Sequence, residues 1–304
     1  MSVFTAKSSL KIQRSWGEKL ADIIIYTVLI LLLVAILLPF YNMLLISFAK
    51  YEDIVQTKLY LYPKSLDFSN YRRAFEAENF ANSFGLSVFV TITGTALGLL
   101  MQSTAAYCLS RPHMPFRRFF FYLILFTMFF GAGLIPWYTV MLALGFKDSI
   151  WVMIIPQAVN AYNIILLRNY FRSIPGELIE SAKIDGAGEL RTMFQIVLPV
   201  SLPILATVAL FIAVGRWNEW YSAMIFIQDP KKIPLQLFLR RMIVDATSDL
   251  GNDMKNAMRD ANIKIHGRSL QMAAVTITTV PILLVYPFLQ RYFTTGIMIG
   301  AVKA

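Results

Sequence analysis

Long apolar segments separated by polar connections dominate the chain. A helix needs about 20 apolar residues to cross ~30 Å of hydrocarbon, and six segments reach that length once single polar interruptions are allowed. They cover Ile23–Phe48, Phe84–Cys108, Phe119–Leu144, Ile150–Leu167, Leu202–Trp217 with a more polar continuation to Phe226, and Met272–Leu289. The pattern predicts an all-α membrane protein with six transmembrane helices, whose two termini lie on the same side of the membrane.

Several of these apolar segments contain proline, which removes a backbone donor and bends or breaks a helix. The prolines are Pro39, Pro136, Pro156, Pro281 and Pro287. Within a membrane such residues are tolerated where neighbouring helices satisfy the freed carbonyl groups. We therefore expect a packed bundle of bent helices.

The composition agrees with a membrane protein and argues against several other classes. Hydrophobic residues make up 57% of the 304 residues and charged residues 15%, against about 25% charged residues in soluble domains. The net charge of +10 comes from basic residues spread over the polar connections, which indicates membrane flanks and not a nucleic-acid-binding face. The first apolar segment follows basic residues as in a signal peptide, but its length indicates a membrane anchor.

The sequence contains no recognisable catalytic, metal-binding or nucleotide-binding pattern. No Gly-Lys dipeptide occurs, so a phosphate-binding loop of the G-x-x-x-x-G-K-[ST] type is absent. Cys108 is the single cysteine, and His113 and His266 lie in separate polar connections. Five of the six apolar segments lack an acidic residue in their interiors, whereas a proton-coupled carrier is expected to show such a relay. We expect no catalytic residue, metal ion or cofactor on this chain.

A polar and aromatic cluster at the end of the fifth apolar segment is the exception. Arg216 and Glu219 are three residues apart, so they are neighbours on a helix and can neutralise each other. Alternatively, the cluster lines a water-filled path in which aromatic rings stack on sugars and polar side chains bind hydroxyl or carboxylate groups. The candidate path residues are Arg216, Trp217, Asn218, Glu219 and Trp220, with Trp137 and Tyr138. Asn160, Tyr162 and Asn163 are further candidates, with helix packing as the alternative.

The connection between the fourth and fifth apolar segments predicts two short helices around a bend. Ser173 can cap a helix whose first turn accepts Pro175, and Gly186 ends that helix with the backbone freedom of glycine. Apolar positions recur at helical spacing in both halves, at Ile174, Leu178 and Ala182, then at Leu190, Met193, Phe194 and Val197, up to Pro199. Such a unit fits a groove in another protein or lies on lipid, and spacing leaves both alternatives open.

The same connection carries a motif of several spaced positions. Glu180-Ser181-Ala182 is followed after three residues by Gly186, and nine residues later by Ile196-x-Leu198-Pro199. This motif resembles the E-A-A-x3-G-x9-I-x-L-P signature of permease subunits in binding-protein-dependent ABC importers, with Ser181 as a small-for-small departure from alanine. The resemblance extends over most of the chain, through Asn82-Ser83, Ala105-Ala106-Tyr107, Ser110-Arg111, Trp217-Asn218, Gln290-Arg291-Tyr292-Phe293 and Gly300-Ala301-Val302-Lys303. These segments are similar to the carbohydrate-uptake family that includes the second permease of maltose importers, and residues 130–136 resemble its polysaccharide branch.

The resemblance implies the type I ABC importer permease fold, in which six membrane helices carry a cytoplasmic coupling helix. That helix maps onto Glu177–Gly186 and sits in a cleft of an ATPase subunit. The residues implied in ATPase coupling are Glu177, Glu180, Ser181, Ala182, Asp185, Gly186, Ile196, Leu198 and Pro199. The implied partners are a homologous second permease in a heterodimer, two ATPase subunits that bind ATP and Mg²⁺, and an extracytoplasmic solute-binding protein.

Counts of Lys and Arg leave the orientation undecided, whereas the resemblance implies cytoplasmic termini in a bacterial inner membrane. The expected divisions are a cytoplasmic segment over residues 1–22, a permease domain over 23–289 and a cytoplasmic tail over 290–304. Within the domain, residues 173–199 form the coupling loop and residues 228–270 an extracytoplasmic loop. A short surface helix is expected in the second loop, on the spacing of Asp245, Asp249, Asp253 and Arg259.

The function implied by the resemblance is import of oligosaccharides or polysaccharide fragments by alternating access, driven by the partner ATPases. A positive charge at Arg216 favours an acidic saccharide such as an alginate or pectin fragment, unless Glu219 cancels that charge. An ABC permease for a non-sugar solute and a secondary carrier that works without ATP are the alternatives.

Overall fold

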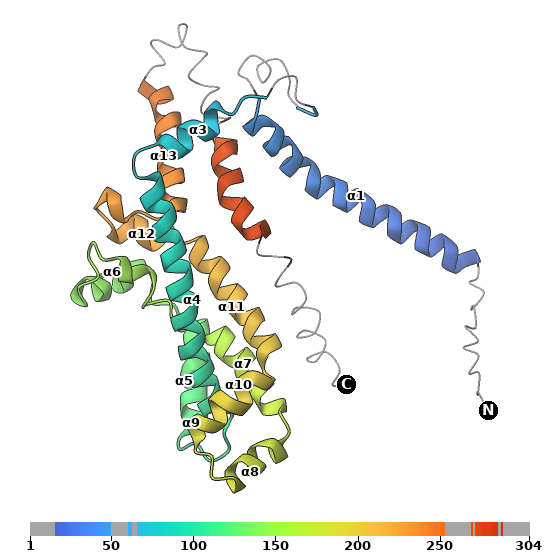
Figure 1. Ribbon diagram of the computed structural model, residues 1–304, viewed down its shortest axis with the longest axis vertical. Helices are drawn as coiled ribbons and strands as arrows, with labels where there is room; N and C mark the ends of the chain where they lie inside the picture. Colours follow the sequence, from blue (N-terminus) through green and yellow to red (C-terminus); the bar gives the residue numbers. More distant parts are fainter. Residues whose placement is uncertain are drawn as a thin grey trace, which may run out of the picture.

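Helix α4 (Phe80–Ser110) forms the axis of the computed structural model, which describes residues 16–49, 60–62, 66–252, 269, 271–284 and 287 (Figure 1). Its 31 residues are apolar enough to cross a membrane. Helices α7 (Ala161–Ser173) and α11 (Leu202–Trp217) pack along it. Gly94 of α4 leaves room for Arg216 of α11, because a Cβ atom at this glycine would lie 3.0 Å from the arginine Cδ. Small residues thus let the helices approach closely.

Helix α1 (Trp16–Ser47) extends away from the other helices (Figure 1). Its apolar side chains are exposed along most of its length, and its C-terminal end contacts the rest of the chain, where Ile46 packs with Ala49 and Tyr60. The expectation of a packed bundle is therefore wrong for this helix. Because exposing so much apolar surface to water is unfavourable, lipid or another chain must cover it.

The third apolar segment, expected as one span over Phe119–Leu144, is divided into α5 (Arg117–Phe129) and α6 (Leu134–Ala143). The two helices are bent by 120° at the break. Gly133 has a φ of +84°, which favours glycine, and Pro136 lies in the first turn of α6, where its missing N–H costs no helical hydrogen bond. The expected bend is therefore present, but it divides the segment into two helices.

The fourth apolar segment, expected as a helix over Ile150–Leu167, is not continuous either. It begins with the 3-10 helix η1 (Ile150–Met153), and the chain is then irregular as far as Asn160, the residue before α7. Pro156, which has no N–H to donate, lies in the irregular part. Only the second half of the predicted span is therefore an α-helix.

Side chains of neighbouring helices satisfy the carbonyl groups of this irregular segment. Gln102 of α4 donates a hydrogen bond to the backbone oxygen of Ala158 at 2.8 Å. Arg216 of α11 donates to the backbone oxygens of Met153, at 3.0 Å, and of Gln157. Irregular backbone at membrane depth requires such partners, because lipid supplies none.

Three helices of the described residues are long and apolar enough to cross a membrane. They are α1, α4 and the run over Leu202–Phe226, which comprises α11 and α12 (Tyr221–Phe226). The bent pair α5 and α6 makes a fourth if it is one span, and the apolar helix over Gln271–Leu284 is shorter. Of the six predicted spans, the third and fourth are thus broken and not continuous helices in the described part.

The connection between α7 and α11 contains four short helices. They are α8 (Gly176–Ile184), α9 (Glu189–Thr192), the π-helix η2 (Met193–Val197) and α10 (Leu198–Val200). Ser173 ends α7, and α8 begins after Pro175, so the expected capping by Ser173 is wrong. The chain also stays helical through Pro199, where the pattern predicts an end. The proline ring would clash with the carbonyl of Gln195, and the wide π-turn relieves that clash.

The far end of α4 meets α3 (Ser69–Glu76), the 3-10 helix η3 (Pro230–Lys232) and α13 (Leu235–Asn252). The loop over residues 228–270 thus contains a helix of 18 residues, longer than the short surface helix that the acidic pattern predicts. Asp245 and Asp249 belong to α13. Asp253, Arg259, the predicted segment over residues 1–15 and the predicted tail over 290–304 lie outside the described residues.

Candidate functional site

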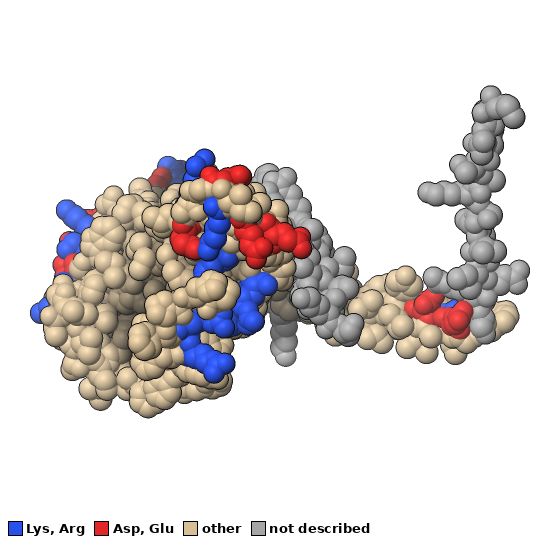
Figure 2. Space-filling view, turned by 90° about the horizontal axis from the view of Figure 1, so that it is seen from below, with Lys and Arg blue, Asp and Glu red and all other residues tan. Residues whose placement is uncertain are grey.

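Charged side chains gather at the end of the molecule where α8 and α9 lie (Figure 2). Helix α8 exposes Glu177, Glu180 and Ser181, and Asp185, which directly follows the helix, is exposed as well. Ala182, one residue further, is buried. The predicted coupling helix therefore turns a small apolar side chain towards the protein and its acidic side chains outwards.

Gly186 turns the chain from α8 towards α9. Its φ is +79°, in the left-handed region where a side chain is strained. The N–H groups of Gly186 and Ala187 donate to the backbone oxygens of Lys183 at 3.0 Å and Ala182 at 2.9 Å, which satisfies carbonyls at the helix end. The bend thus lies where the sequence predicts it.

Large apolar side chains remain exposed on this loop, namely Leu178, Ile184, Leu190 and Phe194. Ile184 is 86% exposed. Of the predicted apolar stripe after the bend, Met193 and Val197 are buried in the core, whereas Leu190 and Phe194 are not. Of the remaining motif residues, Ile196 and Leu198 are half-buried and Pro199 is exposed. Exposed apolar side chains gathered in this way mark a surface that binds protein or lipid.

The carboxylate of Glu189 connects this loop to α4. One oxygen accepts a hydrogen bond from the Tyr107 hydroxyl at 2.6 Å, and the other pairs with the Lys183 ammonium of α8 at 2.9 Å. The hydrogen bond from Tyr107, and then that from Lys183, lower the pKa of Glu189. The Arg111 guanidinium lies 4.4 Å from the centre of the Tyr107 ring. Two helices of the loop and the end of α4 therefore meet at one carboxylate.

Gln157 joins Arg216 to Glu219. Arg216 donates hydrogen bonds to the side-chain and backbone oxygens of Gln157, and the Gln157 amide nitrogen donates to the Glu219 carboxylate at 2.6 Å. Glu219 also accepts from the N–H of Ser222 at 2.8 Å. The two charges that their spacing predicts to be paired are thus bridged by an amide side chain from the irregular segment.

A cavity of about 340 Å³ opens beside Arg216, between α4, the irregular segment with the start of α7, and α11. Its polar lining comes from Gln102, Gln157, Asn160, Asn163 and Arg216. The side-chain oxygen of Gln102 and the Nε of Arg216 are buried without a hydrogen-bond partner. Small-molecule sites occupy ~300–1,000 Å³ and place a few polar groups in this way. The cavity can therefore hold a small polar ligand.

Three of the predicted path residues in this region take packing or surface positions. Trp217 is buried, and Asn218 is exposed and accepts a hydrogen bond from Gln236 at 3.0 Å. The Arg240 guanidinium stacks on the ring of Trp220, with its Cζ atom 3.7 Å from the centre of that ring. One face of this indole is therefore covered by α13.

Trp137 and Tyr138 of α6 pack against α12. Their rings lie 5.1 Å and 5.3 Å from the ring of Phe226, measured between centroids. Among the candidate path residues, Arg216 lines the polar cavity, and so do Asn160 and Asn163 of the further candidates. The structure thus brings three of the candidates to the cavity, whereas Trp137, Tyr138, Trp217 and Trp220 contact other side chains.

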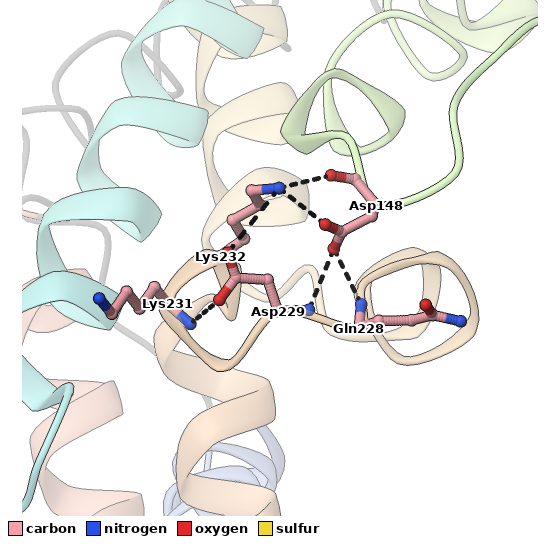
Figure 3. Close-up of polar contacts among 5 residues, drawn as sticks. All are labelled: Asp148, Gln228, Asp229, Lys231 and Lys232. Atoms are coloured by element: carbon pink, nitrogen blue, oxygen red, sulfur yellow. Dashed lines mark hydrogen bonds and ion pairs between the residues drawn. The ribbon is translucent and has the colours of Figure 1, made fainter.

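A second polar cluster surrounds Asp148, between α6 and η1 (Figure 3). Its carboxylate accepts hydrogen bonds from the N–H groups of Gln228 and Asp229, both at 3.0 Å, and from the Lys232 ammonium at 2.7 Å. Lys232 also donates to the backbone oxygen of Asp148 at 3.0 Å. The hydrogen bond from Lys232, followed by those from the two N–H groups, lowers the pKa of Asp148 to about 2. The ionised side chain of Asp148 thus joins the connection between α6 and η1 to the segment that begins after α12.

Sequence reasoning alone missed several of these residues, namely Gln102, Gln157, Asp148, Lys232, Lys183 and Glu189. For the two glutamines a signal exists, because each is a polar residue inside a predicted apolar segment. For Asp148 and Lys232 no spacing rule applies, since they are 84 residues apart. The Tyr107–Glu189 hydrogen bond joins residues 82 apart and is equally invisible in the sequence.

Residues 94–298 match the family described as binding-protein-dependent transport system inner membrane components. The chain belongs to this family. It is 39% identical to the polygalacturonan/rhamnogalacturonan transport system permease protein YtcP of Bacillus subtilis, over 94% of this chain and 99% of that protein. It is 30% identical to the melibiose/raffinose/stachyose import permease protein MelC of the same organism, over 88% of this chain and 91% of that protein.

Solved structures support the same assignment. A chain from the crystal structure of a bacterial ABC transporter involved in the import of the acidic polysaccharide alginate matches with a TM-score of 0.82 and 32% identity, over 92% of this chain and 99% of that chain. A chain from a bacterial alginate ABC transporter in complex with alginate pentasaccharide-bound periplasmic protein matches with a TM-score of 0.52 and 14% identity, which shows the fold alone.

The predicted family and the type I permease fold are therefore confirmed. The chain is an integral inner-membrane permease subunit. Membership of a binding-protein-dependent family decides against the alternative of a secondary carrier.

Proposed function

We propose that this permease passes oligosaccharides or polysaccharide fragments, acidic ones among them, from a solute-binding protein across the inner membrane. The observation that carries this proposal is the 39% identity to a polygalacturonan/rhamnogalacturonan permease over 94% of the chain. The TM-score of 0.82 to a chain of the alginate importer supports the same substrate class. Polygalacturonan and alginate share a chemical unit, the uronate.

In this proposal the energy comes from two partner ATPase subunits that bind ATP and Mg²⁺, and this chain hydrolyses nothing. Helix α8 docks in a cleft of one ATPase. The exposed side chains of Leu178, Ile184 and Leu190 support a protein contact there, and Glu177, Glu180 and Asp185 lie on the same exposed loop. When ATP closes the ATPase dimer, α8 moves with its subunit, and the permease pair opens outwards. Hydrolysis resets it inwards and releases the saccharide.

The coupling loop lies in the cytoplasm in this proposal, together with both termini. Helix α4 then carries motion across the membrane, since its end is bonded to the loop through Tyr107 and Glu189. The cluster of Asp148 and Lys232 faces the solute-binding protein at the outer surface. A homologous second permease completes the path, and the exposed apolar surface of α1 supports a further chain or lipid beside it.

Affinity purification of the tagged chain from native membranes in mild detergent tests the proposal. We expect a P-loop ATPase and a second permease to copurify, and the complex to show ATPase activity that is stimulated by the binding protein loaded with trigalacturonate. A chain that purifies alone and supports uptake without nucleotide contradicts the importer. Stimulation by a loaded non-sugar binding protein, and not by any saccharide, contradicts the substrate class only.

A further inference from the structure

The cavity beside Arg216 has polar groups that the protein itself leaves unsatisfied. The Gln102 side chain is 1% exposed and donates to Ala158, yet its oxygen has no donor. Arg216 is 4% exposed, and its Nε has no acceptor although its two terminal nitrogens do. A buried polar group without a partner is costly, so each of them indicates a ligand or water in the cavity.

The charges around the cavity are asymmetric. Arg216 is the charged side chain among the described residues that line it. Glu219, the nearest acidic partner along the chain, is held on the other side of Gln157 and accepts from Ser222. The carboxylate is therefore not part of the cavity wall, whereas the guanidinium is. Amide side chains of Gln102, Gln157 and Asn163 supply donors and acceptors suited to hydroxyl groups.

We infer that this cavity is a substrate site on this subunit, which binds one sugar unit through its amide side chains and prefers a unit that bears a carboxylate because Arg216 lies in its wall. This inference rests on the proposed function and adds to it the place and the chemistry of a contact with the substrate. The volume of about 340 Å³ fits a small ligand and not a long oligosaccharide. The part of the site that this subunit supplies therefore holds one sugar unit at a time.

Substitutions at Asn160 test the charge preference of the site without disturbing the fold. It is exposed at the rim of the cavity, and its side-chain oxygen accepts the N–H of Asn163 at 3.1 Å as the cap of α7. Aspartate and serine both preserve such a cap, but only Asn160→Asp brings a negative charge to the cavity. We expect Asn160→Asp to lower the rate of trigalacturonate uptake about tenfold through repulsion, and the uncharged Asn160→Ser, which only removes an amide group from the rim, to lower it much less.

The measurement uses the importer assembled with its partner subunits in proteoliposomes, with binding protein saturated with trigalacturonate. Asn169→Asp is the matched control, because Asn169 is exposed on the same helix, outside the cavity, and its oxygen accepts from Arg168, which aspartate can also do. This control should leave uptake unchanged. Asn163→Asp, from the buried wall of the cavity, should act in the same direction as Asn160→Asp. Basal ATPase activity of each variant separates a loss of assembly from a loss of transport.

The outcomes separate failure of the substrate site from failure of the proposed importer function. Equal uptake by wild type, Asn160→Asp and Asn160→Ser, or an equal loss in both variants, overturns the charge-selective site while the importer stands. A wild type that takes up maltotriose but does not take up trigalacturonate also overturns this site. The proposed function as a saccharide importer then still holds. A wild type that takes up no saccharide overturns the proposed function and this inference together.

Discussion

At the scale of single residues, long-range hydrogen bonds of a few side chains connect parts of the chain that are distant in sequence. Glu189 is the clearest case, since its carboxylate bonds to Tyr107 of α4 and to Lys183 of α8. Gly186 acts locally instead, because its left-handed φ of +79° sets the direction in which the chain leaves α8. Both residues act on the geometry of the coupling loop, and each can be tested by a change of a few atoms.

Tyr107→Phe removes the hydroxyl that bonds to Glu189 and leaves the ring in place. Hydrogen bonds to charged groups contribute about 1.5–3 kcal/mol, so the contact between α4 and the loop weakens. We expect less substrate transported per ATP hydrolysed, with the ATPase still active, measured in proteoliposomes of the assembled importer. Tyr122→Phe on α5, where the tyrosine is exposed, is the control. An unchanged ratio of transport to hydrolysis contradicts this role of Tyr107.

Gly186→Ala and Gly188→Ala form a matched pair. A Cβ atom meets no other atom within 4 Å at either glycine, but Gly186 has a positive φ and Gly188 a φ of −70°. Alanine in the left-handed region costs about 1–2 kcal/mol. We expect Gly186→Ala to lower transport and Gly188→Ala to have little effect, measured as initial uptake rates at equal amounts of assembled complex. Equal effects of the two changes would show that the bend is not the cause.

At the scale of elements, the two broken segments show how the fold departs from simple membrane helices. The third predicted span turns by 120° between α5 and α6, and the fourth is irregular before α7. In the fourth, a guanidinium and an amide from neighbouring helices replace the helical hydrogen bonds. The break therefore depends on side chains of other elements, and the cavity exists because of it.

Arg216→Leu should destabilise this arrangement strongly. It removes the donors to the backbone oxygens of Met153 and Gln157, and breaking a buried charged network costs about 3–5 kcal/mol. Arg240→Leu is the control, because Arg240 is exposed and stacks on Trp220, a contact of at most about 1 kcal/mol at such a site. Thermal unfolding of the purified complex in detergent measures both, and equal midpoints for the two variants speak against the structural role of Arg216.

The cluster of Asp148 should make stability depend on pH. The carboxylate is ionised in the folded chain down to a pKa of about 2, below its ordinary value of 3.8. A lowered pKa stabilises the fold above the ordinary value, and this contribution is lost as the pH falls through the folded pKa. We expect wild type to be more stable than Asp148→Asn at pH 6, with the difference shrinking between about pH 4 and pH 2. Thermal unfolding at each pH measures the difference, and a constant gap contradicts it.

At the scale of the whole molecule, α4 separates two polar ends. The coupling loop and the turn between α4 and α5 lie at one end, and η3 lies towards the other (Figure 1). Helix α1 contributes little to the packing of either, because it is exposed along most of its length. Among the described residues, α1 therefore presents apolar surface that lipid or another chain must cover.

Orientation is testable by labelling from one side of the membrane. In a Cys108→Ser background, which removes the exposed native thiol, His113→Cys marks the turn between α4 and α5, and Lys231→Cys marks η3. We expect a membrane-impermeant maleimide to label His113→Cys in inside-out vesicles and Lys231→Cys in right-side-out vesicles. The reverse pattern contradicts a cytoplasmic coupling loop.

The membrane class, the bend at Gly186 and the family could all be predicted from the sequence, because apolar length, glycine position and motif spacing are local properties of the chain. It predicted the third and fourth segments as spans but not their breaks, since an apolar count is the same for a straight helix and a broken one. The role of Arg216 depends on helix packing, since its hydrogen-bond partners come from the irregular segment more than 50 residues away. The polar cavity, the Glu189 connection and the Asp148 cluster were decided in the same way, because each joins side chains whose proximity arises only when the helices pack.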